Sequence, residues 1–465
     1  MRQQAIFGLA ALISFTPLAP LLAQDALGDL LAAQLDPSDA NAEATSLIAS
    51  VRPLLETVPA RNADRAQIEA AAEVYFRARA EGLPDVVIQA SANIQSGNYD
   101  PGPEGQAFIN GALSGFGGSS ETLSNFGALG GINQRQAAVT VTQPLFTGLR
   151  IKNSIQEARH IIDAGFAQLD AMDQDYIVQL ADAHLSAITA GEQIRLVEAS
   201  LELVTQARRA AQISFEAGQS TRTDIALADS RLAGIQAQLA SAQAQALAAQ
   251  NRYRALTGRA PAQIDMSVSV LPLPATLDDA IEKARTNHPL VLAGQAQVEA
   301  REAAVRAAKG RRSPSLQLQG QYAYSENNFF DGDNNDVASL TAQMSVPVFQ
   351  GGAIGSAIRE AKAEARSARF ALDDIERNVA ANVRNSFANY QAALIQREAA
   401  ASRLNAANLA FRGMTIEREV GQRSILDVLE VQEDLLAAEV EAIEAEARLV
   451  LASFQYRAAT GDLLD

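Results

Sequence analysis

The chain repeats itself, and this repeat limits how it can fold more than any other feature. Gly218 and Gly421 lie 203 positions apart, and so do Asp224 and Asp427. Chance similarity does not hold one register over a long span, so the sequence predicts two copies of one structural unit. The same offset pairs Pro144 with Pro347, Leu201 with Leu404, and Thr257-Gly258 with Thr460-Gly461.

Upstream of the strand region the offset becomes 230, which pairs Pro59 with Pro289 and Pro84 with Pro314. The change falls between Asn93 and Val139. The first copy therefore carries a longer loop, over residues 96–136, to which no function can be assigned from the sequence.

Two segments in each copy alternate between apolar residues and Gln, Thr or Ser. Alternation with period two predicts strands, and strands of about ten residues with one apolar and one polar face are typical of membrane strands around a polar lumen. The alternative for any one strand is a half-buried soluble sheet. Single-chain outer-membrane barrels begin at about eight strands, so four strands that span a membrane have to share a barrel with other chains. Three chains would supply twelve. The predicted strands are 85–95, 137–146, 315–325 and 338–348.

After each strand pair the apolar residues recur at alternating threes and fours, which predicts a helix of about 65 residues, roughly 100 Å long. A Gly-Gln turn and a shorter return helix follow. The predicted fold class is mainly α with a small β part. The long helices are expected at 149–216 and 352–419, and the return helices at 222–256 and 424–459.

The start of the chain reads as a secretory signal peptide, residues 1–23, because Arg2 precedes an apolar run that ends in small residues. Proline-rich residues 259–275 are expected to link the two copies. The predicted domains are the signal peptide 1–23, a flexible lead 24–44, a first repeat 45–258, the linker 259–275, a second repeat 276–461 and a tail 462–465.

Composition argues against several classes of function. The net charge of −16 excludes nucleic acid as a favoured partner and suits the wall of a water-filled cavity. The histidines at 160, 184 and 288 are scattered, and no residues have metal-ligand spacing. Asp331–Asp336 resembles a calcium loop but lacks the glutamate of an EF-hand. We therefore expect no enzyme, no cofactor and no metal site.

Three motifs together resemble the TolC family of outer-membrane export ducts. They are the duplicated halves, the junctions Gln143–Gly148 and Val346–Gly352, and the turn Val420–Leu429. The resemblance implies a homotrimer with a twelve-stranded β-barrel in outer-membrane lipid and a helical tunnel through the periplasm. It also implies two partners, a periplasmic adaptor protein and an inner-membrane transporter. The implied function is export from the cell as part of a tripartite pump.

The resemblance also implies roles for residues at the helical tip. Asp427 and Glu430 match the acidic residues that close the pore, although Glu430 stands where the family usually has aspartate, and the first copy has Leu227 instead. Asp224 and Arg423 match a pair that links the helical hairpins when the gate is shut. The turn residues expected to receive the adaptor are Gly218, Gln219, Gly421 and Gln422.

Two bland interpretations stay open. An acidic pair on a helix is usually a solvated face, so Asp427 and Glu430 need no role in a pore. The alternative for the whole protein is a soluble periplasmic coiled-coil adaptor or scaffold, which explains the long helices but not four alternating strands at matched positions.

Overall fold

The computed structural model of this chain describes residues 58–94, 133–258, 276–326 and 334–463, with a few isolated positions between them. The predicted signal peptide, the lead 24–44, most of the loop 96–136 and most of the linker 259–275 lie outside the described residues.

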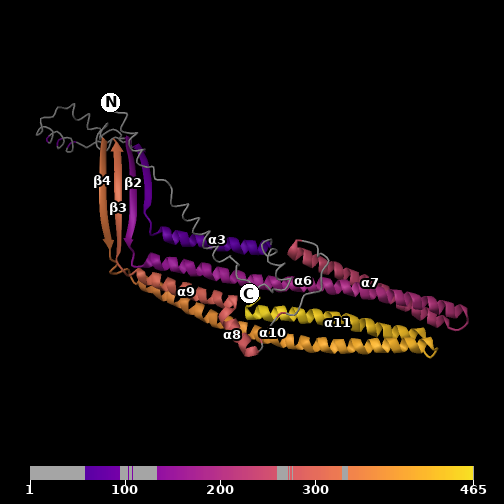
Figure 1. The fold of residues 1–465 in the computed structure, drawn as a ribbon. Coiled ribbons are helices and arrows are strands. Elements are labelled where there is room, and N and C mark those ends of the chain that lie inside the picture. The colour runs from indigo at the N-terminus through magenta and orange to yellow at the C-terminus, as the bar shows by residue number, and fades with distance from the viewer. Residues whose placement is uncertain are drawn as a thin grey trace. The chain divides into compact units, whose positions relative to one another are not determined.

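Six of the seven described helices form three pairs of equal length, one helix from each copy, and α8 has no described counterpart. Figure 1 shows the described helices and strands. The longest pair has 67 residues per helix and the return pair has 36. None of the described helices has an apolar stretch long enough to cross a membrane. The order is α3 (Pro59–Ala80), β1 (Asp85–Ile94), β2 (Asn133–Phe146), α6 (Arg150–Glu216), α7 (Arg222–Thr257), α8 (Leu277–Asn287), α9 (Pro289–Gly310), β3 (Ser315–Glu326), β4 (Asn334–Ser345), α10 (Ala353–Glu419) and α11 (Ile425–Thr460).

Contacts divide the chain into two compact units, and each unit combines segments from both copies. Among the described residues, the first contains 58–70, 161–258, 276–298 and 368–463, and the second contains 71–94, 133–160, 299–326 and 334–367. A sequence copy is therefore not a separate packing unit, because its segments pack with segments of the other copy.

The second unit contains one sheet with the order β1-β2-β3-β4, and every neighbouring pair is antiparallel. Residues directly opposite each other share a face. One row across the sheet is Val86, Val141, Gly320 and Leu340, and the row on the other face is Val87, Thr140, Gln321 and Ser339. The predicted apolar and polar faces are thus present, and within this chain the apolar face is open, with Leu340 74% exposed.

Two strands differ from the sequence prediction by more than one residue. β2 begins at Asn133 rather than 137, and β4 spans Asn334–Ser345 rather than 338–348. Pairing carries the strands into the polar loop ends, where Arg135 lies 3.7 Å from Glu326. At the other end, Pro347 has no N–H to donate to the ladder, and the apolar residues 346–348 lie beyond the strand.

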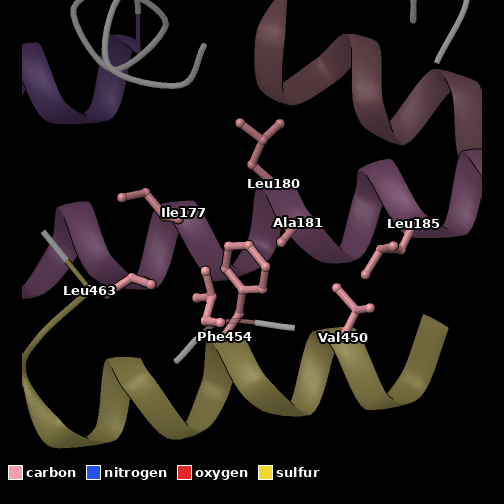
Figure 2. Packing of buried hydrophobic residues seen from close by; sticks show 8 residues of the cluster. Ile177, Leu180, Ala181, Leu185, Val450, Phe454 and Leu463 are labelled. Carbon is pink, nitrogen blue, oxygen red and sulfur yellow. The ribbon is translucent and has the colours of Figure 1, made fainter. Parts of the chain in front are cut away.

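One of the apolar clusters of the first unit lies mainly between α6 and α11 (Figure 2). Phe454 of α11 extends towards α6 between Ile177 and Ala181, and Leu185 faces Val450. Polar contacts fix the ends of the return helices against α6. Gln174 Nε2 donates to the carbonyl of Gly461 at 2.9 Å, and the Tyr176 hydroxyl donates to the carbonyl of Leu256 at 2.6 Å.

The return helices end at equivalent glycines in different surroundings, which gives a matched test. Both have positive φ, 70° at Gly258 and 87° at Gly461. A Cβ at Gly461 would lie 2.7 Å from His288 Cα, whereas a Cβ at Gly258 would meet nothing within 4 Å. We expect Gly258→Ala to cost about 1 kcal/mol of stability and Gly461→Ala about 3 kcal/mol, because only the second adds a clash to the backbone strain. Thermal unfolding measures both, and equal shifts in Tm would contradict the packing described here.

Candidate functional site

Two helical turns form the candidate site, one where α6 meets α7 and one where α10 meets α11. In the first turn the N–H of Gly218 donates to the carbonyl of Phe215 and the N–H of Gln219 to that of Ser214, at 2.9 and 2.8 Å. In the second turn Gly421 and Gln422 make the same two bonds, to the carbonyls of Arg418 and Glu417. This Schellman arrangement needs a left-handed residue, and each glycine supplies it.

The helix that follows each turn begins with a reciprocal cap. Thr221 Oγ1 accepts the N–H of Asp224, while the Asp224 carboxylate accepts the N–H of Thr221 at 2.8 Å. Ser424 and Asp427 repeat this arrangement, with the Ser424 N–H donating to the Asp427 carboxylate at 3.0 Å. Each cap satisfies N–H groups that the first helical turn leaves without partners. Both aspartates therefore have a structural role at the start of a helix.

The structure does not bring Asp224 and Arg423, the predicted latch residues, together as an ion pair. Arg423 Nε donates instead to the Glu417 carboxylate of its own hairpin at 2.8 Å. That hydrogen bond is the main reason that the pKa of Arg423 is raised, and the nearby charge of Asp427 adds to the shift. Arg423 is thus held on the second hairpin, next to a predicted gate residue.

The two predicted gate carboxylates lie at the start of α11 in different environments. Asp427 is half-buried and Glu430 is exposed. In the first copy Leu227 stands at the position of Glu430 and is 47% exposed, so only the second hairpin presents both acids. Among the described residues, no group of three or more His, Asp or Glu side chains lies close enough together to hold a metal ion.

An apolar cluster holds the two hairpins together behind the turns. An ion pair between Arg231 of α7 and Glu433 of α11 joins the hairpins at their exposed side. Within the first hairpin, Arg208 of α6 pairs with Asp229 of α7 at 2.9 Å. The buried members of the cluster are Leu196, Val197, Val204 and Ala207 of α6, Ile235 of α7, and Leu429 and Leu436 of α11.

A hollow of about 340 Å³ lies beside this cluster, between α6, α10 and α11. Arg418 and Gln432 are among the residues that line it. The buried Oε1 atom of Gln432 has no hydrogen-bond partner in the part of the chain that the structure describes. Ala207 and Leu429 of the cluster also line this hollow, so the cluster is open on that side.

Sequence reasoning missed three residues that shape the turns, namely Thr221, Ser424 and Glu417. The first two had a readable signal, because a Ser or Thr three positions before an acidic residue at a helix start is typical of a capping box. Glu417 had no such signal, because its contact with Arg423 depends on how the turn folds.

The duplicated caps give a matched pair of variants. Ser424→Ala should speed amide hydrogen exchange in the first turn of α11 about fivefold, because losing such a cap typically costs about 1 kcal/mol. Thr221→Ala should have a similar effect on α7. Exchange followed by mass spectrometry measures both, and unchanged rates in either helix would show that its cap does not stabilise that end.

Several known proteins resemble this chain in sequence. The sequence profile of the family described as "Outer membrane efflux protein" matches residues 51–259 and 280–462. The outer membrane efflux protein BepC of Brucella suis is 28% identical to this chain over 70% of the chain and 71% of BepC. The outer membrane protein TolC of Vibrio cholerae is 24% identical, over 64% of the chain and 70% of TolC.

A solved structure supports the fold. A crystal structure of CusC aligns with a TM-score of 0.75 and covers 91% of this chain and 95% of that one. The sequences are only 15% identical, so this likeness concerns the fold alone.

Proposed function

The chain belongs to the outer membrane efflux protein family, and from this premise we propose that three copies form one export duct, gated at the two helical turns. The protein is an outer-membrane export channel with a periplasmic extension, and it acts within a tripartite pump. The trimer, the gate residues and the contacts with an adaptor and a transporter are the proposed parts.

The unpaired outer strands of the sheet are evidence for a barrel that several chains share. Its two outer strands, β1 and β4, each pair on one side only among the described strands. In lipid an unpaired edge leaves N–H and C=O groups without partners, each at a cost of several kcal/mol. Pairing β4 of one copy with β1 of the next satisfies these groups, and three copies close the ring with twelve strands.

The internal repeat predicts the register of this pairing. Within the chain, β2 of the first copy pairs with β3 of the second, and Val141 lies opposite Gly320. The equivalent positions on the outer strands are Met344 of β4 and Ala90 of β1. If the copies repeat around the ring, Met344 of one chain lies opposite Ala90 of the next.

Cysteine pairs test this register, because the native chain contains no cysteine. Ala90→Cys combined with Met344→Cys should give covalent trimers on a denaturing gel after oxidation, since directly opposite Cβ atoms lie about 5 Å apart. The control combines Ala90→Cys with Leu340→Cys, which shifts one partner by about 13 Å along the strand. Equal cross-linking of both pairs, or of neither, would contradict the proposed register.

Acidic residues at the second turn support the gate. Three copies would place Asp427 and Glu430 around one opening, where rings of carboxylates favour cations. Because Asp427 also caps α11, Glu430 is the carboxylate more available to passing ions. Glu430→Gln should about halve the ratio of cation to anion permeability in planar bilayers. Glu444→Gln is the control, since it removes an exposed charge from the same helix about 21 Å further from the turn, and equal effects of the two variants would argue against a gate at Glu430.

The proposed latch is weak by nature. A link between Asp224 and Arg423 requires Arg423 to leave Glu417, and an exposed ion pair contributes about 0–1 kcal/mol. Such a link biases a gate without locking it. The four exposed turn residues, Gly218, Gln219, Gly421 and Gln422, are the proposed docking surface for the adaptor, whose binding would supply the larger free energy.

A further inference from the structure

α6 and α11 pack against each other along a line of apolar residues, and a cavity interrupts this line. Leu185 and Val450 belong to the apolar cluster at one end of this line, and Leu196 belongs to the cluster behind the turns. Between them lies a cavity of about 420 Å³, bounded by α6, α11 and Leu404 of α10. The volume falls in the range of about 300–1,000 Å³ that small-molecule sites occupy.

The cavity has an apolar floor and a charged rim. Leu185, Ile188, Leu196 and Val450 form the floor and are buried, whereas Arg195, Glu439 and Glu446 line the rim. Such a lining suits a ligand with a bulky apolar body and one charge.

The charges at the rim are not equivalent. Arg195 bonds to Glu192 at 2.8 Å, and Glu446 bonds to Arg397 at 2.6 Å. Glu439 is half-buried, and none of the ion pairs among the described residues includes it. Burial raises the pKa of Glu439, and the charge of Arg195 offsets part of that shift. The partly desolvated carboxylate is the group that would gain most from an added positive charge.

The first copy shows that this carboxylate is not needed to build the helix. At the equivalent positions of α7, Gln236 stands for Glu439 and Gln243 for Glu446. Glutamine has nearly the same shape as glutamate but no charge. At these two positions the second copy therefore differs from the first in charge and hardly in the shape of the side chain.

We propose that this cavity binds an amphiphilic organic cation, with its apolar body on the leucine and isoleucine floor and its charge beside Glu439. The proposal concerns binding to the wall formed by α6, α10 and α11, and it holds whether or not the turns act as a gate. A ligand here contacts both hairpins, α6 of the first and α10 and α11 of the second, and so stabilises their packing.

The test uses tetraphenylphosphonium as the cation and tetraphenylborate as an anion of similar size and shape. Equilibrium dialysis of the purified full-length protein in detergent should show saturable binding of the cation, about tenfold weaker in Glu439→Gln because the buried charge partner is lost. Glu444→Gln removes a charge from the same helix outside the cavity and should leave cation binding unchanged. Binding should also weaken as pH falls, because Glu439 takes up a proton. The raised pKa of Glu439 places this loss of binding at a higher pH than for an ordinary glutamate. The charged groups nearby are Glu192, Glu446, Arg195 and Arg397.

A second variant keeps the proposal testable if the charge change disturbs folding. Ala442→Phe fills the cavity, because Ala442 lines it, and should abolish saturable binding while circular dichroism shows unchanged helix content. Equal cation affinity in the native protein and Glu439→Gln would overturn the proposal, as would equal affinity for tetraphenylborate. Neither outcome bears on the cysteine cross-links or on ion selectivity, so the duct and this site fail separately.

Discussion

A β-strand in lipid has to satisfy every backbone N–H and C=O through other strands, and this requirement governs the rest of the structure. The four described strands leave two edges without partners in one chain, and under the proposed trimer other copies supply those partners. Duplication reduces the number of different contacts that have to be built. The pairing of β2 with β3 inside the chain is a template for the proposed pairing between chains, and one set of backbone contacts serves both.

The helical part meets a different constraint, which is to hold very long helices side by side without large side chains. Many of the buried residues of α6 and α11 are alanines, such as Ala181, Ala183, Ala438 and Ala445. Small residues allow close approach along a narrow contact line, and a few large ones, such as Phe454 and Tyr456, fill the places where more than two helices meet. This packing of small residues explains how a chain with only 5% aromatic residues can pack helices of this length.

The sequence predicted the fold class well, because repeat register and hydrophobic period are long signals that local exceptions do not erase. The long and return helices lie within a residue or two of their expected bounds. The strand ends were less predictable, because cross-strand partners such as Glu326 decide where Arg135 joins the sheet. At the turns the glycines and acids were readable from sequence. The partner of Arg423 was not, because Glu417 and Arg423 meet only after the chain reverses. The cavity beside Glu439 was equally hidden, since it arises from gaps between three helices.

The two copies share a backbone but not a charge pattern. In the repeat, Glu430 is equivalent to Leu227. Glu439 and Glu446 are equivalent to Gln236 and Gln243. In a ring of three chains the outline would recur every sixty degrees, whereas the electrostatic potential would recur only every one hundred and twenty. At the tip, a permeating ion would therefore meet Glu430 and Leu227 in alternation, three of each, on a wall whose backbone outline repeats.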